Sequence, residues 1–207
     1  MITLKGVLAA VFLDVGETLV NEERYWGDVA ALAGIEPHVV LAALGVTIER
    51  GEEHTELWRH LGVAAPTGLG DVIYTLGDFY RDALPCLAAL RGRGFRVGLA
   101  GNQSYALEQW SREADLPVDV IGSSASWQIR KPAPAFFDRM VIEAGCEPRE
   151  LAYVGDRVDN DVLPALASGL VAVHLRRGPW GRLQPTPASA LAIDSLSELP
   201  DTLASLA

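Results

Sequence analysis

Residues 7–19 read VLAAVFLDVGETL, and this stretch decides how the rest of the chain is interpreted. Its apolar run ends at Asp14, and Gly16 follows two positions later. A short run that is apolar at every position is typical of a strand buried on both faces of a sheet. Two interpretations of Asp14 are then open: it is a catalytic nucleophile, or it is merely the polar end of a buried strand.

Further apolar runs of the same kind follow along the chain, and amphipathic helical patterns separate them. The runs cover residues 95–102, 118–123, 151–156, 170–175 and, more weakly, 191–193. The helical patterns cover residues 83–91, 105–113, 133–144 and 160–167. Buried strands that alternate with helices predict an α/β fold with a doubly wound parallel sheet, covered by helices on both faces and joined by right-handed connections.

One region interrupts this alternation with helical patterns only. They cover residues 22–33, 38–48 and 53–61, with a shorter one near 69–76, and glycines punctuate them. We therefore expect a core domain formed by residues 1–19 and 79–207, with a small helical domain, residues 20–78, inserted after the first strand. The segment 176–187, rich in Gly, Pro and Arg, is expected to be a surface excursion on which Trp180 packs.

Composition limits the classes of partner and compartment. The formal net charge of -10, from 17 cationic and 27 acidic residues, argues against nucleic acid as a partner. No run approaches the roughly 18 to 20 apolar residues that span a bilayer, so no membrane association is expected. The only cysteines, Cys86 and Cys146, lie in apolar helical patterns and indicate buried thiols in a reducing compartment, the cytoplasm. Monomer and homodimer remain equally open.

The predicted strands deliver polar residues to one edge of the sheet, where ligands bind in parallel α/β folds. These residues are Asp14, Gly101 to Ser104, Lys131, Asp156, Asn160 and Asp161. Carboxylates suit a hard divalent cation such as Mg²⁺, and an ammonium suits a phosphate group bridged to that cation. Taken alone, Asp156 to Asp161 is more typical of a capped helix start than of a metal site, so the functional interpretation depends on the joint order of the whole set.

The sequence resembles the haloacid dehalogenase-like (HAD) hydrolase superfamily over nearly its whole length. DVGET (14–18) resembles the first motif, VGLAGNQS (97–104) the second, RKPAPAFF (130–137) the third and VGDRVDND (154–161) the fourth. The resemblance implies a Rossmann-like core, with residues 20–78 as the cap domain. It also implies a Mg²⁺-dependent phosphatase that acts on a small phosphorylated metabolite.

The same resemblance implies roles for individual residues. Asp14 attacks phosphorus and forms an aspartyl-phosphate intermediate. Asp14, the Gly16 carbonyl and Asp156 hold Mg²⁺, and Asp161 supports that metal site. Lys131 pairs with Asp14 and with the phosphoryl oxygens.

Two positions depart from the family pattern. Gly16 stands where most family phosphatases carry a second aspartate, whose acid–base contribution is typically 10² to 10⁴-fold. Glu17 is one alternative acid. Gly101 stands where a Ser or Thr usually binds phosphate, so the amides of Asn102 and Gln103, or the Asn102 side chain, are expected to bind it instead.

These departures leave other functions open. One is a catalytically weak or inactive protein that binds metal and a phosphorylated ligand in a regulatory role. A metal-independent dehalogenase is disfavoured by the acidic fourth motif. A phosphonatase-like Schiff base is disfavoured because residues 20–78 contain no lysine.

The cap is expected to supply specificity. Arg24, Tyr25 and Trp26 follow closely after the first motif, and we expect them to contact the leaving group of the substrate as part of a lid. The alternative is that these side chains form the cap's own core and solvated face. For Trp58 and His60, that second interpretation is preferred.

Overall fold

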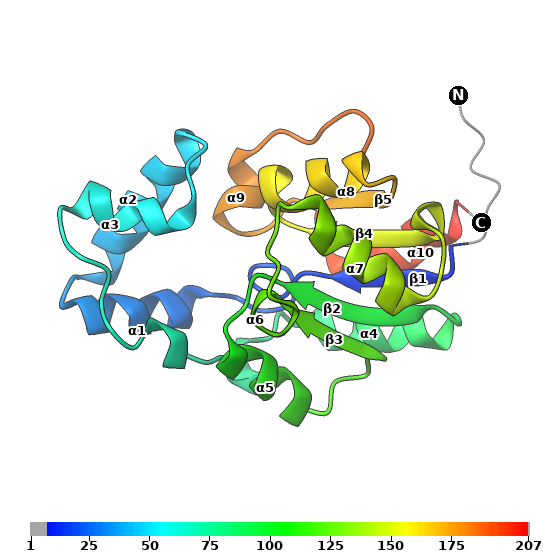
Figure 1. The fold of residues 1–207 in the computed structure, drawn as a ribbon, viewed down its shortest axis with the longest axis horizontal. Coiled ribbons are helices and arrows are strands. Elements are labelled where there is room, and N and C mark those ends of the chain that lie inside the picture. Colours follow the sequence, from blue (N-terminus) through cyan, green and yellow to red (C-terminus); the bar gives the residue numbers. More distant parts are fainter. Residues whose placement is uncertain (1–7, 207) are drawn as a thin grey trace.

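The computed structural model describes residues 8–206, and its sheet forms the centre of the molecule (Figure 1). Six strands pair in parallel in the order β3-β2-β1-β4-β5-β6. They are β1 (Ala10–Leu13), β2 (Arg96–Gly101), β3 (Val120–Ser123), β4 (Leu151–Gly155), β5 (Val171–Leu175) and β6 (Leu191–Ile193). The predicted doubly wound α/β fold is confirmed. The first strand is shorter than expected, and its predicted start at Val7 lies outside the described residues.

Helices cover both faces of the sheet because alternate residues of each central strand are apolar on both sides. Val11 and Leu13 of β1 pack on one face, whereas Ala10 and Phe12 pack on the other. The first face is covered by α4 (Ala83–Gly92), α5 (Tyr105–Glu113) and α10 (Leu199–Ala204), and the second by α7 (Pro134–Ala144) and α8 (Leu163–Ala167). The buried sheet therefore holds its strand ends in fixed positions.

The segment after β1 forms a helical layer beside the sheet, at the left of Figure 1. It contains α1 (Glu23–Ala33), α2 (Pro37–Glu49) and α3 (Leu57–Leu61), whose buried side chains form a separate hydrophobic cluster. The chain enters and leaves this layer side by side: Asn21 N donates to Asp78 O (2.8 Å), and Tyr80 N donates to Leu19 O (2.9 Å). We propose residues 20–78 as a cap domain on a core of residues 1–19 and 79–207.

Several local predictions are corrected. The helix expected near 69–76 is absent from the described structure, where 3₁₀ turns lie at Leu69–Asp71 and Leu76–Asp78, because Gly70 and Gly77 disfavour a continuous helix. The helix expected at 53–61 starts as a 3₁₀ turn (His54–Glu56) before α3. The helix expected at 160–167 starts as a π-type turn (Val158–Val162) before α8.

The segment 176–187 is more ordered than expected. It contains α9 (Gly178–Leu183), where Pro179 at the first turn favours a helix start. Trp180 is buried against the cap cluster instead of packing on a surface excursion. Cys86 is buried in α4, but Cys146 lies beyond the end of α7 and is only half-buried. The short helix α6 (Ser124–Trp127) was not predicted.

Within residues 8–206, no single helix combines the length and apolar character needed to cross a bilayer. Helices α1 and α2 meet that test only together, as a pair bent by 108°.

Candidate active site

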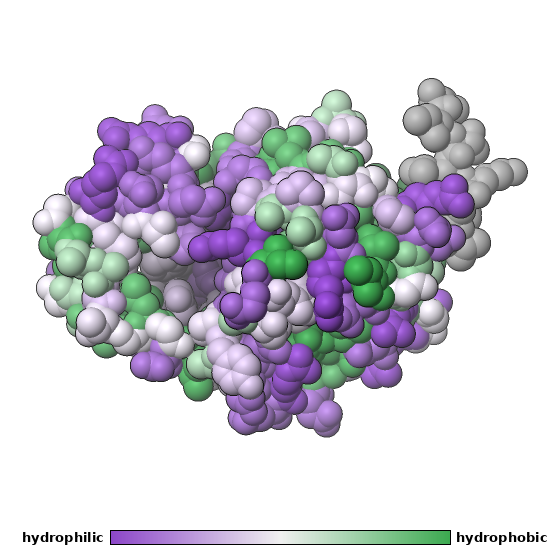
Figure 2. Space-filling model, viewed as in Figure 1, coloured by the Kyte–Doolittle hydropathy of each residue, from purple (hydrophilic) through white to green (hydrophobic). Residues whose placement is uncertain are grey.

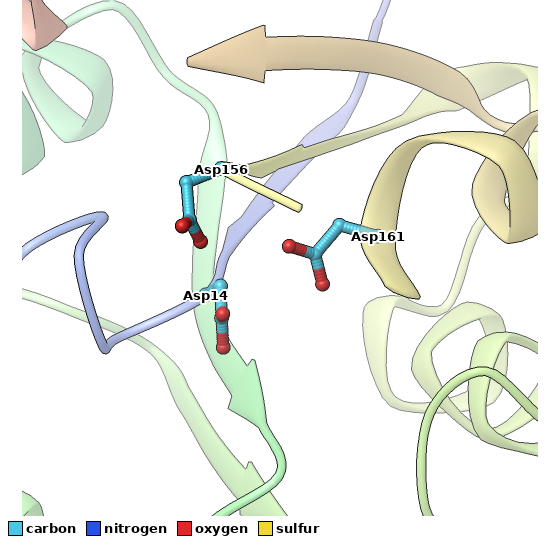
Figure 3. A group of neighbouring side chains, drawn as sticks. All are labelled: Asp14, Asp156 and Asp161. Atoms are coloured by element: carbon cyan, nitrogen blue, oxygen red, sulfur yellow. The ribbon is translucent and has the colours of Figure 1, made fainter. Parts of the chain in front are cut away.

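Three aspartates gather at the carboxyl edge of the sheet (Figure 3). Asp14 follows β1 and Asp156 follows β4, the two adjacent strands at which the chain order reverses. Asp161 comes from the π-type turn that follows β4, and its carboxylate points toward the other two. One carboxylate oxygen of each residue lies within 4.8 Å of those of the others. The sheet topology thus brings together residues that are far apart in the sequence.

Lys131 lies at the centre of this group, with its side chain 1% exposed. Its Nζ is 3.0 Å from Asp14 Oδ1 and 2.5 Å from Asp161 Oδ1, and it donates to the Tyr153 hydroxyl (3.0 Å). Burial opposes the ammonium charge, but the carboxylates of Asp14 and Asp161 outweigh it and raise the pKa of Lys131 above its usual value. The ammonium therefore stays charged and fixes the positions of both aspartates.

Asp161 is placed behind Lys131, away from the cleft. Its Oδ1 accepts from Lys131, and its Oδ2 accepts from the backbone N–H of Arg157 (3.0 Å). A Cβ at position 155 would come within 2.3 Å of Asp161 Oδ2, so only glycine lets β4 pass this close. Both oxygens are engaged within the protein, which fits a supporting role for Asp161 next to a metal.

Asp14 and Asp156 face the cleft, and their surroundings are strongly acidic. Burial, followed by the charges of Asp161 and Asp14, raises the pKa of Asp156 well above its usual range. Burial also raises the pKa of Asp14, although Lys131 opposes it. One ammonium therefore does not balance three clustered carboxylates. The set of carboxylate oxygens, with Gly16 bordering the same cleft, fits a divalent cation such as Mg²⁺.

The residues after β2 have divided roles. The Asn102 side chain makes two hydrogen bonds with the Lys131 backbone, donating to its carbonyl (3.0 Å) and accepting from its N–H (2.8 Å), so it holds the lysine segment. The Gln103 side chain is buried and borders the cleft, and its Nε2 has no partner among the described residues. A Cβ at Gly101 would come within 2.5 Å of Asp14 Oδ1. Gly101 therefore gives Asp14 room, and Gln103 is the available donor for phosphate.

Two glutamates lie near Gly16, and their carboxyl groups have different hydrogen-bond partners. Both oxygens of Glu17 are engaged: Oε2 accepts from the Tyr80 hydroxyl (2.6 Å) and Oε1 from Glu22 N (3.1 Å). Glu22 accepts a hydrogen bond from the Tyr74 hydroxyl (2.5 Å), its carboxyl group also interacts with the Trp26 side chain, and it borders the cleft together with Asp14. Burial, followed by the charge of Glu17, raises the pKa of Glu22 to about 7. From the sequence, Glu17 was the alternative acid for position 16, and Glu22 was not considered.

The cap closes a cleft of about 130 Å³ over these residues. A hollow between the helical layer and the core is visible in Figure 2. Of the three cap residues expected to contact the substrate, Tyr25 and Trp26 border the cleft, but Arg24 does not. Its guanidinium is bound by Asp78 (Nε to Oδ1, 2.9 Å) and by Asp28, so Arg24 fastens the base of the cap.

A model of one protein family, described as haloacid dehalogenase-like hydrolase, matches residues 8–169. The chain belongs to this family. That match covers the candidate site from Asp14 to Asp161, so the HAD-like motifs and the three-dimensional cluster coincide.

Relatives of this HAD-like hydrolase carry phosphatase names. A glyceraldehyde 3-phosphate phosphatase from Methanopyrus kandleri is 29% identical, over 97% of this chain and 99% of its own. A phosphoglycolate phosphatase from Rhodospirillum rubrum is 34% identical, over 60% of this chain and 52% of its own. Among solved structures, a predicted phosphoglycolate phosphatase from Haemophilus somnus has a TM-score of 0.71 at 16% identity, covering 96% of this chain and 99% of its own. This last likeness supports the HAD fold alone.

The HAD-like site also contains four residues outside the substrate-binding set favoured from the sequence, although His54 was one of the cap residues considered for a lid. From the cap, His54 and Tyr74 border the cleft, and from the core Arg157 and Trp180 do so. The Arg157 guanidinium lies 4.7 Å from the centre of the Trp180 ring. The place of Arg157 inside the fourth motif was a signal for it, but no local pattern distinguishes His54 from the other cap histidines.

Proposed function

We propose that this HAD-like hydrolase is a Mg²⁺-dependent phosphatase that acts on a small phosphorylated metabolite. The observation that carries the proposal is the cluster of Asp14, Asp156 and Asp161, in which Asp14 and Asp161 pair with Lys131. The side chain of Asp14 is 14% exposed, so a carboxylate is presented to the cleft beside an ammonium. The acidic excess favours chemistry at phosphorus with a metal ion over metal-independent dehalogenation. The names of the relatives support the same assignment.

The residues divide the reaction between them. The Asp14 carboxylate attacks phosphorus in line, the bond from phosphorus to the leaving oxygen breaks, and water then hydrolyses the aspartyl phosphate. Lys131 balances charge on Asp14 and on the phosphoryl group, while Gln103 Nε2 donates to a phosphoryl oxygen. Asp14, the Gly16 carbonyl and Asp156 would hold Mg²⁺, which would neutralise charge at the phosphoryl oxygens when bound. Asp161 holds Lys131 in place.

The size and lining of the cleft limit the substrate. At about 130 Å³ it is well below the roughly 300 to 1,000 Å³ of sites for drug-sized ligands. Tyr25, Trp26 and Trp180 provide flat apolar walls, and Arg157 provides a cation. We infer a substrate of about two or three carbons besides its phosphate. This range includes the compounds in the relatives' names. A polyanionic nucleic acid does not suit the net charge of -10; a cytoplasmic location is proposed with such a metabolite.

A panel of phosphate esters tests this function. We expect inorganic phosphate release from glyceraldehyde 3-phosphate or phosphoglycolate, and a kcat/KM at least about 10²-fold lower for nucleoside monophosphates, which exceed the cleft. Phosphate release by a coupled assay measures both. Absence of hydrolysis from every ester, with Mg²⁺ and a phosphate mimic still raising the melting temperature, would support the regulatory binding function instead.

Mg²⁺ is expected to stabilise the protein through the carboxylates at the cleft. At a Mg²⁺ concentration of about 100 times Kd, binding contributes about 2.7 kcal/mol, which raises the melting temperature of a chain this long by several degrees. Thermal unfolding with a chelator or with Mg²⁺ measures the shift. The shift should be lost in Asp156→Asn and retained in Asp138→Asn, which changes an exposed aspartate in α7. Equal shifts in both variants would contradict the assignment of Asp156.

A further inference from the structure

The space beside Gly16 is occupied by another residue's carboxyl group. A Cβ built at Gly16 would lie 2.3 Å from Glu22 Oε1 and 2.9 Å from Glu22 Cδ. The side chain that the sequence lacks at position 16 would therefore start where the Glu22 carboxyl group ends. Glu22 is the residue immediately before α1, so the segment that leads from the core into the cap places this carboxyl group.

Glu22 has the surroundings of a positioned reactive group. Its carboxyl borders the same cleft as Asp14 and Lys131. The Tyr74 hydroxyl donates to Oε1 (2.5 Å) from the far end of the cap segment, and the absence of a side chain at Gly16 leaves room for the Glu22 carboxyl group. The Trp26 side chain also interacts with the Glu22 carboxyl group, so both ends of the cap segment hold that group at the cleft.

Glu17, the neighbouring alternative, is held in a different place by its own contacts. The Tyr80 hydroxyl and the Glu22 N–H occupy its two oxygens, and its side chain packs against Gly178, where a Cβ would lie 2.7 Å from Glu17 Oε2. Glu17 therefore acts as a strut between the first motif and α9. Of these two glutamates, Glu22 is the one whose carboxyl group lies in the space that a side chain at position 16 would occupy.

We propose that Glu22 supplies the carboxyl group that position 16 lacks and transfers the proton in both steps of the reaction. This inference rests on the proposed phosphatase function. As Asp14 forms its bond to phosphorus, the bond to the leaving oxygen breaks and the Glu22 carboxylic acid gives that oxygen its proton. The Glu22 carboxylate then takes a proton from the water that attacks the aspartyl phosphate, which releases inorganic phosphate and restores Asp14.

The placement also links catalysis to the cap. Glu22 and Tyr74 both belong to residues 20–78, so the proton-transfer group reaches Asp14 only when the ends of the cap segment lie as they do here. In the family pattern, an acid at position 16 would belong to the core domain. In this chain, the proposed acid, Glu22, belongs to the cap segment.

Glu22→Gln tests the role, because glutamine keeps the shape and still accepts from Tyr74 but transfers no proton. The leaving group separates the steps: an alkoxide needs protonation, whereas 4-nitrophenolate does not. We expect kcat/KM for an alkyl phosphate to fall about 10² to 10⁴-fold and kcat/KM for 4-nitrophenyl phosphate less than about tenfold. With 4-nitrophenyl phosphate, kcat should fall and intact-mass analysis should show phosphorylated enzyme accumulating, since hydrolysis of the intermediate also loses its base.

The matched control is Glu23→Gln, which changes the exposed neighbouring glutamate and should leave both substrates unaffected. A second variant, in which the carboxyl group is moved to position 16, keeps the test decisive if Glu22→Gln misfolds. Gly16→Asp alone crowds Glu22, whereas Gly16→Asp combined with Glu22→Ala puts one carboxyl group back into the same space, and we expect it to restore alkyl-phosphate turnover at least about tenfold over Glu22→Ala.

The outcomes separate the inference from the function on which it rests. An alkyl-phosphate kcat/KM in Glu22→Gln within about threefold of that in Glu23→Gln would overturn the role of Glu22 while leaving the phosphatase intact. Equal losses on both leaving groups without rescue by the relocated carboxyl group would overturn it too. A wild-type protein that hydrolyses neither ester removes the function and the inference together.

Discussion

Asp14→Asn is expected to reduce phosphatase turnover at least about 10⁴-fold, because an uncharged amide cannot attack phosphorus and no other carboxylate at the site replaces it. Asp156 makes no ion pair with Lys131 among the described residues. Both oxygens of Asp161 already accept hydrogen bonds, one from Lys131 and one from the Arg157 backbone. The same substitution should not destabilise the protein. Burial raises the pKa of Asp14, so the folded state disfavours its charged form, and Asn still accepts from Lys131.

Two measurements check this prediction together. Intact-mass analysis after incubation with a reactive phosphate donor and Mg²⁺ should show a phosphoryl adduct on the wild-type protein and none on Asp14→Asn. The melting temperature of the variant should equal or exceed that of the wild type. Asp138→Asn in α7 is the matched control and should retain both adduct and turnover. An adduct of normal yield on Asp14→Asn would show that a different residue is the nucleophile.

Lys131→Met is expected to damage both stability and activity. Methionine fills a similar volume but leaves Asp14 and Asp161 buried without their ammonium, which costs about 3–5 kcal/mol when one partner of a buried ion pair is removed. For a chain of this length that lowers the melting temperature by roughly 6 to 20 °C. Loss of its charge at the phosphoryl group should also lower kcat about 10² to 10³-fold.

An exposed cation provides the comparison. Arg176 pairs with Asp194 on the surface, where the two side chains are 46% and 53% exposed, so Arg176→Met removes the same charge at a cost of about 0–1 kcal/mol. Thermal unfolding of both variants in the presence of a chelator isolates the protein's own contribution. If Lys131→Met melted within about 2 °C of Arg176→Met, the buried charges would not depend on the lysine as the structure indicates.

The core fold and the central carboxylates could be predicted from the sequence because their signals are local. Each buried strand is a continuous apolar run, and in a parallel sheet the residues after such runs meet at one edge. Asp14, Lys131, Asp156 and Asp161 were therefore expected to meet, and the structure brings them together. The register of β1 with β4 places Asp14 beside Asp156, whereas Lys131 and Asp161 come from the segments that follow β3 and β4.

Only the tertiary structure decided the residues that the cap brings to this edge. Arg24, next to the first motif, lies on Asp78 outside the cleft, whereas Trp180, from the segment expected at the surface, borders it. Local periodicity specifies which face of a helix is apolar, but it does not specify the path by which a chain leaves a sheet and returns. That path puts Glu22 against Gly16 and Tyr74 against Glu22. The sequence by itself determined the sheet and the aspartate at the end of its first strand; the folding of the cap onto that sheet determined which carboxyl group lies beside that aspartate.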